Sequence, residues 1–130
     1  MSRHATGTFE VKSWDEQTYA ELEGGGKLTR ASVAQAFTGD IDGEGAVEYL
    51  MCYREDGTAN VVGLHRVVGR VGDQAGSFVL QSTGGFDGRE ARGSLLVVPG
   101  SGTGDLRGLR GEGEMVAGAT TSITLDYDVE

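Results

Sequence analysis

Hydrophobic and polar residues alternate along most of this chain, in segments that glycine-rich stretches separate every eight to fifteen residues. Alternation with period two is typical of strands that bury one face, and this spacing of turn residues is typical of an all-β sandwich or barrel. The pattern predicts eight strands in one domain that spans residues 1–130. Their predicted ranges are 5–14, 28–38, 45–54, 59–71, 76–84, 89–98, 110–117 and 121–129.

Two of these segments also have a helical interpretation. Ser13 and Glu16 have the spacing of a capping box, and residues 31–37 (ASVAQAF) have fair helix propensity. We favour strands in both places, because the neighbouring hairpins need partners there. Residues 15–27, which end in three consecutive glycines, are predicted to form a flexible loop.

The dipeptide Asp56-Gly57 predicts the register of the central hairpin. Asp-Gly favours a two-residue type I′ turn, in which both central residues have positive φ. Such a turn would pair Glu55 with Thr58, Tyr53 with Asn60, Leu50 with Gly63 and Glu48 with His65. The next turns are predicted near Gly72-Asp73 and at Asp87-Gly88, the latter again of type I′.

Because side chains alternate across a strand, this register assigns each residue to one face of the sheet. The predicted inner face contains Ala46, Glu48, Leu50, Cys52, Val61, Gly63, His65, Val67, Phe78, Leu80, Ser82, Ala91, Gly93, Leu95 and Val97. The last strand adds Ile123, Leu125 and Tyr127. A turn at Asp42-Gly43 would add Val33, Gln35 and Phe37 from the second strand, beside Phe9 and Val11 from the first.

Eight antiparallel strands with one apolar face predict a closed barrel, because closure removes the exposed sheet edges. A barrel of this size is just wide enough to hold one small ligand. The predicted inner face is rich in small residues, which favours a cavity. The other interpretation is that the glycines only relieve strain at bends and bulges.

Charge and cysteine content limit the classes of binding partner and the cellular compartment that this chain can have. The 11 Lys and Arg residues against 20 Asp and Glu residues give a net charge of −9, which argues against binding to nucleic acid or to an anionic membrane surface. The single cysteine, Cys52, excludes an internal disulfide, and we interpret it as a small core residue. The first residues lack the apolar region of a signal peptide, and no apolar run approaches the roughly 20 residues of a membrane helix. We therefore expect a soluble, cytoplasmic protein.

Residues 100–111, GSGTGDLRGLRG, resemble the loop G-G-x-G-x-F-x-G/A-x-x-G of allene oxide cyclases and plant dirigent proteins, which are eight-stranded β-barrels. Leu106 stands where those families usually have Phe. The order of the segments TFEVKSW, KLTRASV, FTGDIDGEGAVEYLM, VGLHRVVGR, GSFVLQ, VVPGSGTGDLRGLRGEG and LDYD resembles a bacterial family catalogued as domain of unknown function 3224. This resemblance implies an allene oxide cyclase-like barrel and no established reaction. In such a loop, Leu106 and Leu109 would tuck into one end of the barrel.

The motifs of common cofactor and metal sites are missing. Gly102, Gly104 and Gly108 do not have the spacing of a dinucleotide loop, and Gly26-Lys27 lacks the rest of a phosphate-binding loop. Two histidines and one cysteine cannot form a zinc site, and no nucleophile elbow is present. We predict no cofactor and no metal.

The charge inside the apolar run AVEYLMCY (residues 46–53) suggests the candidate site. In the predicted register Glu48 faces His65 on the inner wall, where a buried carboxylate requires a partner. We assign these two residues as the candidate catalytic pair, acting as general acid and base or as a polar anchor. The remaining candidates, assigned to ligand binding, are Gln35, Leu50, Phe78, Leu80, Ser82 and Tyr127. The alternative is that the pair only stabilises the strand register.

Two functional hypotheses follow, and both place a small hydrophobic molecule inside the barrel. In the first, the protein only binds it. In the second, the protein is a cofactor-free cyclase, isomerase or lyase, the chemistry that resemblance to allene oxide cyclases implies. A purely structural role remains open if the barrel is solidly packed.

The predicted outer face suggests self-association. It carries Val47, Tyr49, Met51 and Tyr53 beside Val62, Leu64 and Val68, with Ala34 and Ala36 adjacent. A contiguous apolar patch on a barrel exterior is typical of an interface, so we expect a homo-oligomer. The alternative is that residues 15–27 cover this patch.

Overall fold

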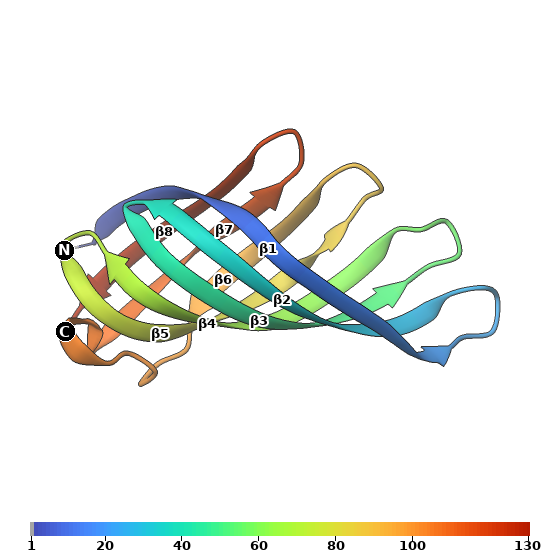
Figure 1. Cartoon of the computed structure of the whole chain (residues 1–130), viewed down its shortest axis with the longest axis horizontal. Helices are drawn as coiled ribbons and strands as arrows, with labels where there is room; N and C mark the ends of the chain where they lie inside the picture. Colours follow the sequence, from blue (N-terminus) through green and yellow to red (C-terminus); the bar gives the residue numbers. More distant parts are fainter. Residues whose placement is uncertain (1) are drawn as a thin grey trace.

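The computed structural model describes residues 2–130, and these residues form an all-β closed barrel of eight antiparallel strands (Figure 1). Each strand pairs with its neighbours in sequence, and β1 closes the barrel against β8. The strands are β1 (Arg3–Glu21), β2 (Lys27–Gly39), β3 (Ile41–Tyr53), β4 (Ala59–Val71), β5 (Gln74–Phe86), β6 (Ala91–Val97), β7 (Leu109–Ala117) and β8 (Thr121–Val129). The one helical element of the described chain is a 3-10 turn, η1 (Gly104–Leu106). The predicted fold class is therefore confirmed.

The first strand is longer than its pattern predicts. β1 continues to Glu21, so the loop predicted over residues 15–27 is confined to residues 22–26, and the helical alternative at Ser13 is wrong. Two irregularities, between Val11 and Ser13 and between Thr18 and Ala20, shift the pairing of β1 with β2. Each β-bulge breaks strict alternation, and for this reason the segment does not show the period of a strand. The helix alternative over residues 31–37 is also wrong, because β2 covers them.

The central hairpin has a different turn from the predicted one. Tyr53 pairs with Ala59, Arg54 N–H donates to Thr58 O, and Gly57 N–H donates to Arg54 O. Gly57 has φ +88°, whereas every non-glycine residue described has negative φ, which excludes a type I′ turn at Asp56-Gly57. The loop has three residues and ends in a glycine bulge, so the register differs by one residue from the prediction.

This one-residue difference inverts β3, as expected for a period-two element. Val47 and Met51 are buried, while Glu48, Leu50 and Cys52 point outward and are exposed. The inner positions of β2 are nevertheless correct, because the turn before β3 lies at Gly39 and Asp40 and not at Asp42-Gly43. The error in the turn between β3 and β4 and the error in the turn between β2 and β3 therefore cancel for the residues of β2.

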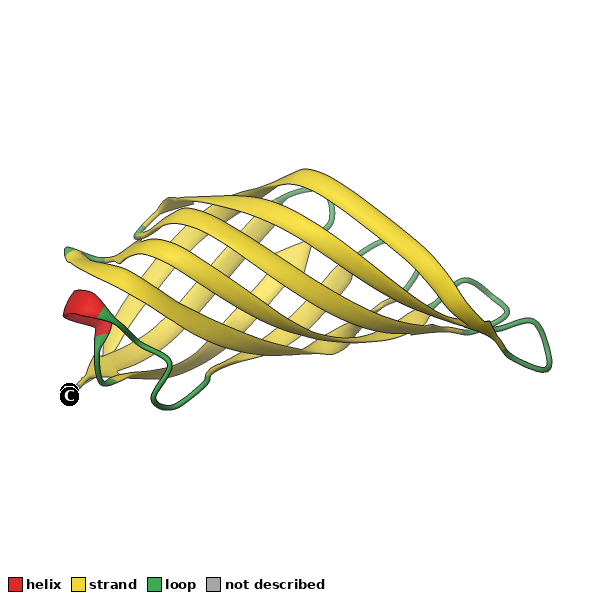
Figure 2. Ribbon diagram, turned by 60° about the horizontal axis from the view of Figure 1, so that its bottom comes forward, coloured by secondary structure: helices red, strands yellow, loops and turns green. Residues whose placement is uncertain are grey.

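The two ends of the barrel differ. Both chain termini, the η1 loop and the tight turns between β2 and β3 and between β4 and β5 lie at one end, and the loops that join β1 to β2, β3 to β4, β5 to β6 and β7 to β8 lie at the other, which we call the hairpin end (Figures 1 and 2). At the η1 end, Leu106 and Leu109 are buried in a core with Ile41, Ile123 and Leu125, as the glycine-rich loop predicts. The loop before η1 is held to β5 by a 2.7 Å hydrogen bond between the hydroxyls of Thr103 and Ser77. The η1 end is therefore packed solid, and any interior space must lie toward the hairpin loops.

Candidate functional site: an apolar cavity at the hairpin end

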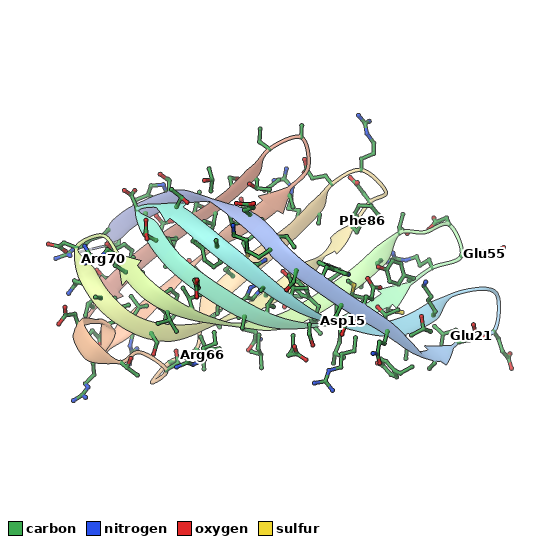
Figure 3. The ribbon with its side chains drawn as sticks, in the orientation of Figure 1. Asp15, Glu21, Glu55, Arg66, Arg70 and Phe86 are labelled. Carbon is green, nitrogen blue, oxygen red and sulfur yellow. The ribbon has the colours of Figure 1, made fainter. Side chains whose placement is uncertain are left out.

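The hairpin half of the barrel contains a cavity of about 340 Å³. Figure 3 labels Phe86, which lines it, near the hairpin end of β5, and Arg70 at the packed end. Aliphatic and aromatic side chains dominate the wall. The lining residues are Phe9, Val11, Trp14, Gln35, Tyr49, Met51, Tyr53, Ala59, Val61, Ser82, Gly84, Gly85, Phe86, Ala91, Arg92, Gly93, Met115 and Ala117.

The small residues of the inner wall have two structural roles, one in the cavity and one in β7. Ala91 and Gly93 line the cavity, and a Cβ on Gly93 would have no heavy atom closer than 3.7 Å. At Gly113, in contrast, a Cβ would lie 1.8 Å from the Thr124 carbonyl oxygen, so that glycine permits a close approach of two backbones. The small residues therefore leave space in the cavity and relieve crowding in β7.

At the inner end of the cavity, three polar side chains are hydrogen-bonded in series. Ser82 Oγ lies 2.9 Å from His65 Nε2, and Gln35 Oε1 lies 3.3 Å from His65 Nδ1. All three residues are buried, and His65 is fully so. They come from β2, β4 and β5, where strict alternation directs each of them inward.

Burial lowers the pKa of His65 to about 4, because the imidazolium would lose its hydration inside the barrel. The aromatic ring of Tyr49 packs edge-on to the imidazole, with a centroid distance of 5.4 Å. At neutral pH His65 is therefore an uncharged imidazole that can both donate and accept a proton.

Tyr49 lines the cavity beside this polar group. Its ring covers Gly63, where a Cβ would come within 2.6 Å of the ring and 3.0 Å of Ser82 Oγ. Burial raises the pKa of Tyr49, and a hydrogen bond from the Gln35 side chain offsets part of that rise. The phenol therefore stays protonated at neutral pH.

The rim of the cavity is more polar. Trp14 Nε1 donates to Glu16 Oε1 at 2.9 Å, and the Trp14 ring packs on Tyr49 with centroids 5.9 Å apart. Partial burial alone would raise the pKa of Glu16, but the Trp14 N–H and the nearby hydroxyls of Thr29 and Tyr53 lower it. The pKa of Tyr53 is raised to about 12 by burial and by the nearby Glu16 carboxylate.

The predicted pair of Glu48 and His65 is wrong. The Glu48 carboxylate lies on the outer surface, where it accepts hydrogen bonds from Arg30 Nε at 3.0 Å and Nη2 at 2.8 Å. The hydrogen bonds from Ser32 and Arg30 lower the pKa of Glu48. His65 does face inward, but the residue opposite it on β3 is Val47.

The predicted ligand-binding residues fall into three groups. Gln35 and Ser82 line the cavity. Phe78, Leu80 and Tyr127 point inward but belong to the packed core toward the η1 end. Leu50 is on the outer surface, because of the inverted β3.

Sequence reasoning missed the residues that β3 and β1 contribute, among them Tyr49, Met51, Tyr53 and Trp14. The segment AVEYLMCY is apolar on both of its faces, so alternation alone could not orient β3. The signal that could have done so was Glu48 itself, since an acidic residue in a half-buried strand favours the solvent face. Trp14 could not be placed without the bulge after Val11.

No helix among residues 2–130 is long and apolar enough to cross a membrane. Within the same residues, no group of three or more His, Cys, Asp or Glu side chains is arranged to hold a metal ion.

The fold and the cavity together define a small, closed antiparallel β-barrel whose interior is packed at one end and hollow at the other. The chain belongs to the family described as "Protein of unknown function (DUF3224)", whose model matches residues 5–128. It is similar to the crystal structure of a DUF3224 protein of unknown function from Shewanella oneidensis MR-1. That similarity has 31% sequence identity and a TM-score of 0.86, and it covers 100% of this chain and 99% of the other. No protein with a curated description matches the chain significantly.

Proposed function

We propose that the protein binds one small apolar molecule in the hairpin-end cavity. The observation that carries this proposal is the lining, which is aromatic and aliphatic except for a few inward polar groups. Ligand sites in proteins typically have volumes of about 300–1,000 Å³ and combine an apolar wall with a few polar groups that orient the ligand. The cavity of about 340 Å³ falls at the small end of that range.

The polar groups favour a ligand whose buried end is uncharged. Gln35, Tyr49 and Ser82 are neutral, and burial keeps His65 neutral as well. The lining guanidinium, Arg92, is hydrogen-bonded to Glu90 at 2.7 Å. An ion at the inner end would lose its hydration without an opposite charge to pair with, whereas a carbonyl or hydroxyl would find hydrogen-bond partners.

The alternative function, a cofactor-free cyclase, isomerase or lyase, rests on the resemblance to allene oxide cyclases. The Glu48 carboxylate cannot take part in such a reaction, because it lies outside the barrel. The observation that still favours it is the neutral pair of His65 and Ser82 at the cavity wall, since both side chains can transfer protons.

Native mass spectrometry tests the binding proposal. The protein is incubated with a panel of neutral apolar compounds, such as medium-chain alcohols, aldehydes, methyl esters and phenols, and with an apolar extract of the producing cells. We expect one molecule per chain to bind, and organic solvent to release it for identification. A panel and an extract that leave only the unliganded mass would contradict the proposal.

We also propose that the protein self-associates, through a face that differs from the predicted one. Val47, Tyr49 and Met51 point inward, so they cannot contribute. The outer apolar face consists of Leu50, Val62, Leu64, Val68 and Leu96, each between 47% and 53% exposed. Leu50 and Val62 are cross-strand neighbours, which makes this part of the face contiguous, and a second copy offers an equally apolar surface to cover it.

A further inference from the structure

The hydrogen-bonded series of Gln35, His65 and Ser82 has an order with chemical consequences. A hydroxyl contacts one nitrogen of an imidazole at 2.9 Å, and an amide oxygen contacts the other nitrogen at 3.3 Å. The same order, in which a nucleophile contacts a base and the base contacts an orienting group, defines the activated serine and cysteine sites of unrelated folds. Binding of a small apolar molecule alone would not require a hydroxyl, an imidazole and an amide in this order.

The protons in this series can be placed. The amide oxygen of Gln35 can only accept, so His65 Nδ1 carries the hydrogen. His65 Nε2 is then an acceptor, and the Ser82 hydroxyl must donate to it. This is the tautomer in which imidazole can accept the serine proton.

The serine oxygen is within reach of a bound molecule. Ser82 lines the cavity, whereas His65 is fully buried behind it. The lack of a side chain at Gly63 makes room for the Tyr49 ring beside the serine, since a Cβ there would lie 2.6 Å from that ring and 3.0 Å from Ser82 Oγ. A ligand carbonyl at the inner end of the cavity would therefore meet the hydroxyl and not the base.

We propose that Ser82 is a nucleophile activated by His65, and that the cavity transfers the acyl group of a small apolar ester to the Ser82 hydroxyl. This inference rests on the proposed binding of a small apolar molecule. Ser82 Oγ attacks the ester carbonyl and gives its proton to His65 Nε2. The tetrahedral intermediate then expels the alcohol oxygen, which takes the proton from His65, leaving acyl-Ser82 and a free alcohol. Water, activated in the same way, releases the carboxylic acid and restores the serine.

Tyr49 is placed to assist this step. Its phenol lines the cavity together with Ser82, and we expect its hydroxyl to donate to the oxyanion that forms on the ester. Gln35, in contrast, orients His65 without neutralising the imidazolium that forms during the reaction. We therefore expect acylation to be slow and deacylation slower, so that the acyl-enzyme accumulates.

Incubation with p-nitrophenyl butyrate tests the inference. We expect p-nitrophenol release equal to one per chain, a gain in intact mass of one butyryl group, and peptide mapping that locates this group on Ser82. Ser82→Ala should abolish the adduct, and His65→Gln should slow its formation by about 100-fold, the usual contribution of a general base. Tyr49→Phe should slow it by about 100-fold, the usual loss on removing one hydrogen-bond donor to an oxyanion. Ser77→Ala, a serine on the same strand that is bonded to Thr103 and lies outside the cavity, is the matched control and should react as the wild type does.

A parallel titration with p-nitrophenyl butyl ether, which has the same shape but no acyl group, separates the two proposals. If the ether binds and the ester leaves Ser82 unmodified, the nucleophile is wrong and the binding site stands. If neither compound binds, both proposals are wrong. Butyryl groups that map only to lysines or to the N-terminus would also overturn the inference, and this readout does not depend on whether any variant folds.

Discussion

At the level of single residues, His65 is a titratable side chain held away from water. It is fully buried, it hydrogen-bonds two neutral partners, and Tyr49 is the titratable group packed against it. Burial is the cause of its low pKa of about 4. An unfolded chain would instead have a histidine pKa of about 6.5. The difference links folding to pH.

The pH dependence of stability follows from this shift. Between pH 6.5 and 4 the unfolded chain binds a proton at His65 that the folded chain does not, so stability falls as pH falls. The contribution of His65 is complete above pH 6.5 and declines by about 3 kcal/mol by pH 4. His65→Gln, which keeps hydrogen-bonding groups but cannot titrate, should remove this slope. Urea unfolding at several pH values measures the free energy of unfolding of both proteins. If that free energy falls with pH equally in wild type and in His65→Gln, His65 is not buried as described.

At the level of elements, the turns decide which residues reach the cavity. A single residue of slip at residues 54–58 inverts β3 and replaces Glu48 and Leu50 on the inner wall by Val47 and Tyr49. The backbone explains the slip, because the loop has one positive-φ position, at Gly57, where a type I′ turn needs two.

Gly57→Ala tests this turn. A Cβ at Gly57 would meet nothing within 4 Å, so the cost of the substitution is the left-handed backbone alone. We expect a loss of about 1 kcal/mol in the free energy of unfolding, the usual penalty for a side chain at positive φ. Glu55→Ala, in the same loop but at negative φ, is the control and should change stability little. Equal stabilities of wild type and Gly57→Ala would contradict the glycine bulge.

Alternation and glycine spacing were enough to predict eight strands and the inward faces of β4, β5 and β8, including His65, Ser82 and Leu125. The charged residues of β4 and β8 all lie on the outer face, and the large apolar residues Phe78 and Leu80 mark the inner face of β5, so the orientation of these strands does not depend on a turn type. They were not enough for β3, which is apolar on both faces, or for β1, whose two bulges break the period. The candidate site failed at Glu48 for that reason, while Gln35 and Ser82 were predicted correctly as inward residues.

At the level of the whole molecule, the inside and the outside of the barrel suggest different partners. The inside offers an apolar cavity at one end, and the outside offers the apolar face of Leu50, Val62, Leu64, Val68 and Leu96. Both surfaces draw on β3 and β4, with opposite faces of the same strands. Substitutions on one surface should therefore leave the other intact.

Self-association through the outer apolar face predicts a mass above the 13.6 kDa of one chain in sedimentation at micromolar concentration. Leu64→Glu, which places a charge on the face, should return the protein to a monomer. Thr38→Glu adds the same charge at an exposed position elsewhere, on β2, and should leave the assembly unchanged. A wild-type protein that sediments only as a monomer would contradict the interface.

The most direct test of the central claim is a titration with the neutral fluorophore N-phenyl-1-naphthylamine, which brightens in apolar surroundings. Wild type should bind it saturably, one molecule per chain. Gly93→Leu should abolish binding, because the new side chain would fill the cavity where a Cβ at Gly93 has free space. Ser94→Leu adds the same side chain to the outer face of β6 and should bind as the wild type does. Undiminished binding by folded Gly93→Leu, or equal loss in both variants, would show that the cavity is not the binding site.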